Sequence, residues 1–265
     1  LYGGSFRFFE ELAARQLAHF HYFATLEDLT AQINPKIEAV FLETPTNPLM
    51  TEIDVAAAAE LAHQIEALLI VDNTFLTPLR QKPLDQGADI VLHSGTKFLT
   101  GHNDILAGVV VAKEAALGER LTYLANTTGP TLSSFDCWLF IRSLKTLPLR
   151  FERQEQNAKE IADFLKRQPA IKEVLYPGVG GMISLRLKDA GKIKEFLRRL
   201  SLFTFAESLG GVESLITYPT TQTHADIPKE LRESYGLTPD LLRLSIGIEK
   251  QQDLIADLTQ ALAQI

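Results

Sequence analysis

Short apolar runs alternate with a helical stretch over residues 39–112, and most of the runs end in polar residues. The runs read AVFLE, LLIVD, ADIVLH and AGVVVA, and DVAAAAELAHQIEA between the first two has the spacing and composition of a helix. The runs are continuously apolar instead of alternating, which is typical of strands that are buried on both faces. We therefore predict a mostly parallel sheet with helices on both sides.

The second half of the chain has a different pattern. A long helical stretch over residues 134–167 is interrupted at Pro148, and four apolar segments follow it: GMISLRL, LFTFAES, ESLITYP and LLRLSIGI. Further helical stretches cover residues 190–200, 228–236 and 249–265. This order is typical of an α+β domain with a mostly antiparallel sheet. The predicted fold class is therefore α/β, with a large domain over residues 1–142 and a smaller α+β domain over residues 143–265.

Composition narrows the choice of partners. The net charge is −7 without blocks of like charge, which argues against nucleic acid or an anionic membrane as the main partner. No apolar run is long enough to span a membrane. The single cysteine, Cys137, can form no internal disulfide, which favours a reducing, cytoplasmic compartment, and its apolar surroundings predict a buried side chain. The six histidines lack acidic or cysteine partners at ligand spacing, so we expect no metal site.

Polar side chains follow the strands of the predicted parallel sheet, where ligands of such sheets bind. Asn47 follows the first strand and Asp72 ends the second. Ser94, Thr96 and Lys97 follow the third. An acid, a lysine and hydroxyl groups together suit a Schiff base with a phosphorylated cofactor that carries a pyridinium ring. Each residue alone is more often a turn former or a solvated charge, so only their convergence supports a site.

Six segments stand in order along the chain: LYGGSFRFF, ETPTNPLM, IVDNTF, HSGTKFLTGHNDILAG, AESLGGVESLITYPTTQTHADIP and LLRLSIGIE. With this order and spacing the chain resembles the Cys/Met-metabolism family of pyridoxal-phosphate (PLP) enzymes, over essentially its whole length. Within the family it is most similar to the cystathionine γ-synthase and O-acylhomoserine thiolyase proteins. The resemblance implies fold type I of PLP-dependent transferases, PLP as cofactor and a homotetramer built as a dimer of dimers.

The resemblance also implies roles for the residues at the strand ends. Lys97 would bond covalently to the cofactor and later move protons. Asp72 would pair with the pyridine nitrogen, and Asn47 would donate a hydrogen bond to the ring oxygen. Ser94 and Thr96 would contact the phosphate.

Further roles follow from the same resemblance for the substrate. Tyr2 would stack on the cofactor ring and act as an acid–base group. Arg243 would bind the α-carboxylate, since a planar guanidinium suits a carboxylate, with support from Ser208 and Thr223. Glu207 would lie near the distal end of the substrate, where it could pair with a second amino group. Without the resemblance, Tyr2 is better explained as an exposed aromatic residue and Arg243 as a strand-edge charge. For Glu207 a solvated strand-end residue and a functional residue are equally consistent with the sequence.

We therefore predict an enzyme of cystathionine γ-synthase type, which replaces the acyl group of O-acylhomoserine with cysteine in transsulfuration and methionine biosynthesis. Cystathionine β-lyase and γ-lyase activities, which eliminate sulfur, would use the same residues and stay open. The chain has no initiator methionine and no counterpart of the family's remaining phosphate ligands, so we expect an amino-terminal segment to be missing. A non-catalytic family remnant is the alternative of another class. The family usually has alanine in place of Gly95, a departure that we expect to have little effect.

Overall fold

The computed structural model describes residues 1–225, 227–263 and 265, which form two compact units. Unit 1 consists of Leu1–Phe20, Pro45–Thr51 and Pro148–Ile265, and unit 2 of His21–Thr44 and Glu52–Leu147. The short segment Pro45–Thr51 therefore belongs to unit 1, although the chain on either side of it belongs to unit 2. The proposed domains 1–142 and 143–265 stay a prediction.

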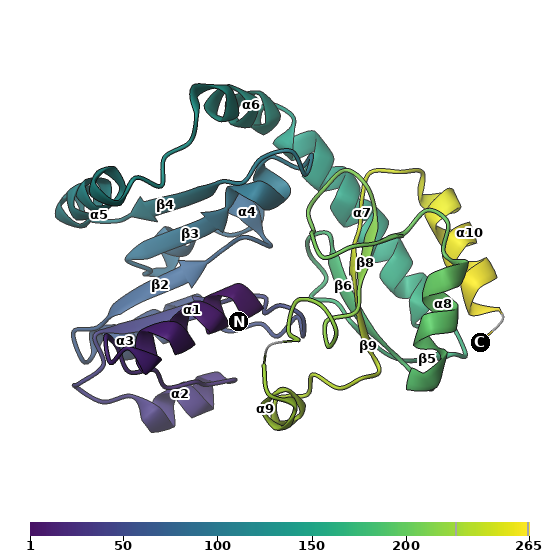
Figure 1. Cartoon of the computed structure of the whole chain (residues 1–265), viewed down its shortest axis with the longest axis horizontal. Helices are drawn as coiled ribbons and strands as arrows, with labels where there is room; N and C mark the ends of the chain where they lie inside the picture. The colour runs from purple at the N-terminus through teal and green to yellow at the C-terminus, as the bar shows by residue number, and fades with distance from the viewer. Residues whose placement is uncertain (226, 264) are drawn as a thin grey trace. The chain divides into compact units, whose positions relative to one another are not determined.

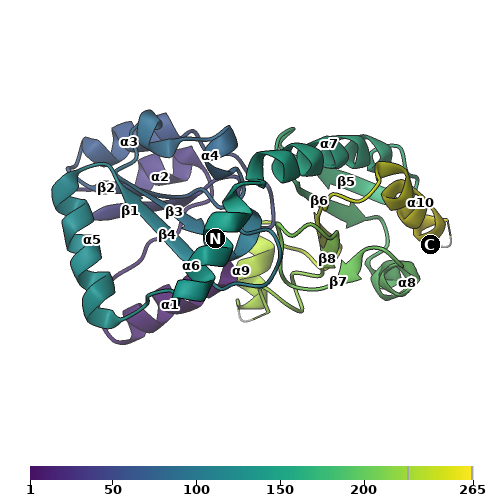
Figure 2. The ribbon, with the colours of Figure 1, turned by 90° about the horizontal axis from the view of Figure 1, so that it is seen from above.

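Unit 2 contains a four-stranded sheet with the order β1-β2-β3-β4 (Figures 1 and 2). Its strands are β1 (Ala39–Glu43), β2 (Leu68–Asp72), β3 (Ile90–Ser94) and β4 (Gly108–Ala112). The first three strands are parallel, and β4 runs antiparallel to β3. The predicted α/β class and the mostly parallel sheet are confirmed.

Two helices of unit 2 pack on one face of this sheet. Its helical elements are α2 (Leu26–Gln32), α3 (Val55–His63), α4 (Thr77–Arg80), η1 (Pro83–Gln86), η2 (Gly95–Leu99), α5 (Ala115–Thr128) and α6 (Ser134–Leu144). Asp54 caps α3 by accepting the N–H groups of Ala56 and Ala57. Side chains of α2 and α3 form a core with β1, β2 and β3. The expectation of burial on both faces is wrong for β4, whose residues are exposed or half-buried.

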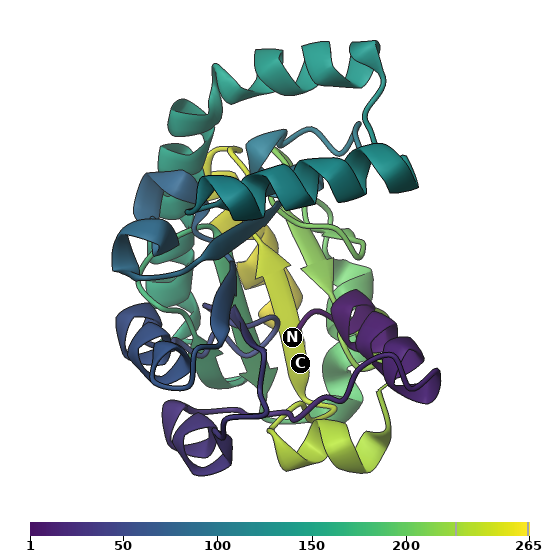
Figure 3. The ribbon, with the colours of Figure 1, turned by 90° about the vertical axis from the view of Figure 1, so that its left-hand side faces the viewer.

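Unit 1 contains a five-stranded sheet with the order β5-β6-β9-β8-β7. Its strands are β5 (Ile171–Leu175), β6 (Met182–Leu187), β7 (Thr204–Phe205), β8 (Leu215–Thr217) and β9 (Leu241–Ser245). All pairs are antiparallel except β7 with β8. The mostly antiparallel sheet is confirmed, and β9, the yellow arrow in Figure 3, is its middle strand. The sequence pattern did not predict β5.

The helices of unit 1 are α1 (Gly3–Ala14), α7 (Leu147–Leu165), η3 (Ala190–Lys192), α8 (Ile193–Arg199), α9 (Lys229–Ser234) and α10 (Gln251–Leu262). Helices α7, α8 and α10 pack on one face of the sheet (Figures 1 and 2). Alternate strand residues such as Ile183, Leu185 and Leu244 face this core, because successive side chains of a strand point to opposite faces. The other face carries polar side chains, which are Ser184, Arg186, Thr217, Arg243 and Ser245.

Two further features concern the helices. The side chain of Cys137 on α6 is exposed, so the expectation of a buried cysteine is wrong. Apolar spacing placed it on the inner side of a helix, but α6 has a single buried residue among those described, Ser143. Within the described part of the chain, we find no helix that combines the length and the apolar character needed to cross a membrane.

Candidate functional site

Unit 2 brings Asp72 and Ser94 together at the carboxyl ends of β2 and β3. The hydroxyl of Thr74 lies between them, since it donates to Asp72 Oδ1 at 2.6 Å and accepts the backbone N–H of Ser94 at 2.8 Å. The backbone N–H of Thr74 donates to the same Oδ1 at 3.0 Å. Both bonds from Thr74 use one oxygen of the carboxylate, so they do not engage the second oxygen.

The carboxyl group of Asp72 is sensitive to its surroundings. Burial raises its pKa, and the two hydrogen bonds from Thr74 oppose that shift. A cation placed against the carboxylate would also lower the pKa, because opposite charges favour the ionised form. A protonated ring nitrogen is such a cation, so the environment of Asp72 fits the role predicted for it.

Lys97 lies in η2, the short π-helical turn that directly follows β3 and Ser94. Its φ of −93° and ψ of −129° depart from helical values. Its carbonyl accepts the N–H of Gly101 at 2.8 Å. Thr100 closes the turn, because its N–H and its hydroxyl donate to the carbonyl of Gly95 at 3.2 and 2.8 Å. The turn thus fixes the backbone of a half-buried lysine next to the ends of β2 and β3.

Thr96 ties the same turn to the residue before β4. Its Oγ1 accepts the N–H of Ala107 at 3.0 Å, and its own N–H donates to the carbonyl of Ala107 at 3.2 Å. The hydroxyl also reaches that carbonyl at 3.4 Å. A contact between Thr96 and a phosphate stays a prediction, and it would require the hydroxyl to turn away from Ala107.

Gly95 has little room for a side chain. A Cβ at this position would lie 2.9 Å from the Cβ of Ala107 and 3.1 Å from the ring of Phe140. Carbon atoms normally approach to about 3.5–4.0 Å, so an alanine would displace the turn that carries Lys97. The expectation that glycine in place of the family's alanine has little effect stays a prediction.

Arg243 is the central residue on the polar face of the sheet in unit 1, and it is only 1% exposed. Its Nη1 donates to Asn47 Oδ1 at 2.9 Å. Its Nη2 donates to Thr217 Oγ1 at 3.0 Å and to the backbone carbonyls of Glu207 and Ser208 at 2.8 and 3.2 Å. These acceptors are neutral, whereas a guanidinium keeps its charge in proteins. A ligand carboxylate would supply a negative charge in a geometry that arginine suits.

The orientation of the Asn47 amide follows from Arg243. Arginine can only donate, so the side-chain atom of Asn47 that faces it must be the acceptor, Oδ1. The Nδ2 group then occupies the other branch of the amide, where it is a donor. The predicted contact with the ring oxygen of a cofactor requires a donor of this kind.

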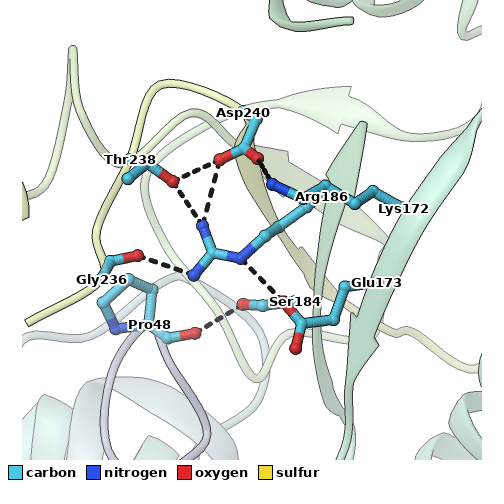
Figure 4. Close-up of polar contacts among 8 residues, drawn as sticks. All are labelled: Pro48, Lys172, Glu173, Ser184, Arg186, Gly236, Thr238 and Asp240. Carbon is cyan, nitrogen blue, oxygen red and sulfur yellow. Dashed lines mark hydrogen bonds and ion pairs between the residues drawn. The ribbon is translucent and has the colours of Figure 1, made fainter. Parts of the chain in front are cut away.

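The loop that carries Asn47 is fixed within unit 1. Ser184 on β6 donates its hydroxyl to the carbonyl of Pro48 at 2.6 Å (Figure 4). The loop also closes on itself, since the N–H of Thr46 donates to the carbonyl of Thr51 at 2.9 Å and the N–H of Thr51 donates to Thr46 Oγ1 at 3.0 Å. Strand β6 therefore holds the loop at a position that lies next to Arg243 in the sheet, because Ser184 and Arg243 are paired residues.

Arg186 fixes the segment that leads into β9. Figure 4 shows it among its partners, which are Glu173, Gly236, Thr238 and Asp240, and Lys172 donates to the other carboxylate oxygen of Asp240. Its side chain is 11% exposed and forms ion pairs with Asp240 at 3.0 Å and with Glu173 at 2.9 Å. Burial alone would raise the pKa of Asp240, but the hydrogen bonds that it accepts outweigh burial and lower the pKa.

Thr223 and His224 lie against the backbone of Asn47. His224 Nε2 is 3.2 Å from the carbonyl oxygen of Asn47, and His224 Nδ1 is 2.7 Å from Thr223 Oγ1. Burial, with a further contribution from positive charges that include Arg243, lowers the pKa of His224 to about 4. The imidazole is therefore neutral at pH 7.

Two glycines place Tyr2 next to Thr223. A Cβ on Gly3 would lie 2.1 Å from the carbonyl oxygen of Thr223, and a Cβ on Gly4 would lie 2.5 Å from Tyr2 Cε1. Helix α1 can thus begin in contact with the backbone of Thr223, with the Tyr2 ring folded over Gly4. Tyr2 is 44% exposed.

The predicted site residues form one group in each unit. The group in unit 2 consists of Asp72, Ser94, Thr96 and Lys97, and the group in unit 1 of Tyr2, Asn47, Glu207, Ser208, Thr223 and Arg243. The residue Glu207 is exposed, and its backbone carbonyl is what reaches Arg243. The roles of these residues stay predictions.

Sequence reasoning gave no role to four residues that complete the two groups, namely Thr74, Ser184, Thr217 and His224. The alternation of apolar and polar residues in ISLRL could have found Ser184, because it places Ser184 and Arg186 on one face. No local signal marks His224, whose partner Asn47 is 177 residues away.

Comparisons with known proteins identify the family of the chain. A family model described as "Cys/Met metabolism PLP-dependent enzyme" matches residues 1–263. The cystathionine gamma-synthase of Haemophilus influenzae is 54% identical over 242 residues, which are 91% of this chain and 66% of that protein. The Bacillus subtilis protein called cystathionine gamma-synthase/O-acetylhomoserine (thiol)-lyase is 52% identical over 267 residues, which are 100% of this chain and 72% of that protein.

A solved structure has a closely similar fold. The crystal structure of cystathionine gamma-lyase from Lactobacillus plantarum, complexed with L-serine, matches with a TM-score of 0.97 at 41% sequence identity. The match covers 100% of this chain and 74% of that one. The chain thus spans about two-thirds to three-quarters of these relatives.

Proposed function

Because the chain belongs to the Cys/Met metabolism PLP-dependent enzyme family, we propose that it has a cystathionine γ-synthase type of activity, in which cysteine replaces the acyl group of O-acylhomoserine. Its α/β fold matches that of fold type I PLP enzymes. We choose the synthase reaction within the family because the chain is 54% and 52% identical in sequence to two proteins that are both named cystathionine gamma-synthases. The exposed Glu207 supports this choice, since its carboxylate suits the second amino group of cystathionine.

The group in unit 2 would hold the cofactor. Bound PLP supplies an electron-withdrawing pyridinium ring, which stabilises negative charge on the substrate carbon next to the amine. Asp72 would keep the ring nitrogen protonated, because the buried carboxylate gains a counter-charge there. The amine of Lys97 would anchor the aldehyde and move a proton to and from the substrate Cα. Ser94 and Thr96 would donate to the phosphate.

The group in unit 1 would hold the substrate. Arg243 would donate to its α-carboxylate, and the neutral acceptors around the guanidinium already fix its plane. Ser208, whose carbonyl is bonded to Arg243, would add a donor. Asn47 would contribute its Nδ2 group to the cofactor oxygen, and Tyr2 would exchange a proton with the amine or the leaving group.

Cystathionine γ-lyase activity is the second candidate. The TM-score of 0.97 to the Lactobacillus plantarum enzyme favours it. β-Lyase activity would use the same residues, so the three reactions differ in their products and not in the residues named above.

An absorbance spectrum with added PLP tests the cofactor assignment first. We expect a visible band from the covalent lysine–cofactor bond, which Lys97→Ala abolishes and Lys113→Ala, a change of an exposed lysine just after β4, leaves in place. The protein is then offered O-acylhomoserine with cysteine, or cystathionine alone. Formation of cystathionine supports the synthase, whereas formation of keto acid and ammonia from cystathionine supports a lyase. A folded protein without the band would refute the proposal.

A homo-oligomer remains part of this proposal. Helix α6 exposes Phe135, Trp138 and Ile141, which are large apolar side chains that a partner surface could cover. We expect light scattering to give a mass several times that of one chain. Trp138→Lys should lower that mass, and a monomer in the unaltered protein would contradict the expectation.

A further inference from the structure

His224 connects segments of unit 1 that are far apart in the sequence. On one side of the ring is the carbonyl of Asn47, 177 residues earlier, and on the other is the hydroxyl of Thr223. The backbone of Thr223 in turn borders Gly3 at the start of α1. His224 is 1% exposed, so water does not compete for these contacts.

The partners of the ring decide which nitrogen carries the hydrogen. A backbone carbonyl can only accept, so the contact with Asn47 requires an N–H at Nε2. A neutral imidazole has one N–H, so Nδ1 is then an acceptor and the Thr223 hydroxyl must donate to it. The lowered pKa of His224 agrees with a neutral ring.

This arrangement determines what Thr223 can offer to a ligand. A hydroxyl has one hydrogen and two lone pairs. Because the hydrogen is directed at His224, the remaining lone pairs can accept a hydrogen bond from an N–H group but cannot donate one to a carboxylate. Arg243 in the same unit only donates. The two residues are therefore suited to opposite ends of an α-amino acid.

We propose that His224 is a positioning residue, which holds the backbone of Asn47 and directs the hydrogen of the Thr223 hydroxyl toward its own ring. Thr223 then accepts a hydrogen bond from the amino group of an amino-acid ligand, while Arg243 binds the carboxylate of that ligand. The ligand part of this proposal rests on the proposed function. The state of the ring and the hold on Asn47 do not depend on it, so they can be tested without cofactor or substrate.

Nitrogen NMR of the full chain labelled with ¹⁵N-histidine tests the state of the ring directly. At neutral pH we expect a neutral ring with its hydrogen on Nε2. The signal is assigned by its loss in His224→Gln or, should that variant not fold, by contacts with the methyl group of Thr223 in the unaltered protein. Hydrogen on Nδ1, or a doubly protonated ring, would overturn the proposal.

Two substitutions of His224 separate its two contacts. Glutamine can place an amide N–H near the position of Nε2, and asparagine can place an acceptor oxygen near that of Nδ1. We therefore expect the loop amides of Met50 and Thr51 to exchange hydrogen roughly fivefold faster in His224→Asn, while His224→Gln resembles the unaltered protein. Equal exchange in the two variants would contradict the role in holding Asn47.

Competition by propionate, a carboxylate without an amine, tests the assignment of Thr223. In the PLP-loaded protein we measure how propionate suppresses the spectral change that L-serine produces. Thr223→Val should leave the inhibition constant of propionate within twofold of its original value and weaken the binding of L-serine at least fivefold. Thr223→Ser should restore the binding of L-serine. A propionate constant that weakens with Thr223→Val would show that Thr223 donates to the carboxylate. Absence of competition in the unaltered protein would instead contradict Arg243 as the carboxylate site, and thus the proposed function.

Discussion

Acid should destabilise this protein through His224. The pKa of His224 in the folded protein is about 4, whereas its ordinary value is 6.5. Above pH 6.5 both states hold a neutral ring and the group contributes nothing to the pH dependence. Between pH 6.5 and 4 the unfolded chain binds a proton that the folded protein excludes, so stability falls as the pH falls. The difference in pKa corresponds to a total loss of about 3 kcal/mol, complete below pH 4.

Urea unfolding followed by circular dichroism measures this effect. Between pH 7.5 and pH 5.0 the ring accounts for a loss of about 2 kcal/mol in the free energy of unfolding, because about 1.5 pH units of this interval lie below the ordinary pKa of histidine. His224→Gln carries no titrating group at this position, so its stability should fall by about 2 kcal/mol less than that of the unaltered protein. Carboxyl groups such as Asp240 titrate in both proteins and cancel in the comparison. An equal loss in the two proteins would refute the reasoning about burial.

Three other substitutions test the frame of unit 1. Arg186→Leu should lower the free energy of unfolding by roughly 3 kcal/mol in a urea titration, since it leaves the partly buried Asp240 without the more buried of its two ion pairs. A loss below about 0.5 kcal/mol would mean that Lys172 suffices. Gly3→Ala should lower the free energy of unfolding by about 2 kcal/mol and speed proteolysis of α1, because its Cβ would meet the Thr223 carbonyl. Gly129→Ala is compared with it, since no atom lies within 4 Å of that Cβ but φ is positive, so that this variant measures backbone strain alone. Asp257→Asn should lower the melting temperature, since both carboxylate oxygens accept backbone N–H groups of residues 201–203, and an unchanged temperature would contradict that assignment.

The strands of unit 2 were predictable because their signal is local. Continuous apolar runs bounded by polar residues gave β1, β2 and β3, and the same runs placed Asp72 and Lys97 at one edge. Strand β5 was not predicted, because its sequence IKEVL mixes charged and apolar residues at an edge of the sheet. The expected interruption at Pro148 is confirmed, because α6 ends at Leu144 and α7 begins at Leu147, which places Pro148 in the first turn of α7, where a missing N–H is not needed.

The group of site residues in unit 1 was predictable only in part, because its bonds join distant residues. Family resemblance named Arg243 and Thr223, but the bond between Arg243 and Asn47 spans 196 positions and no spacing rule encodes it. The role of His224 appears only when both of its neighbours are in place. Conversely, the exposure of Cys137 depends on what α6 packs against, and composition carries no information on that.

The loop Pro45–Thr51 affects the order in which parts of the protein can fold during synthesis. During synthesis the loop leaves the ribosome early, whereas its anchors Ser184, His224 and Arg243 are made far later. Bringing chain segments together over such separations costs entropy that grows slowly with length, and contacts of this kind slow folding. The loop must therefore wait in a non-native environment until β9 exists. The group around Asn47 and Arg243 is thus a late product of folding, because a chain that ends before residue 241 lacks β9 and with it the bond from Arg243 to Asn47.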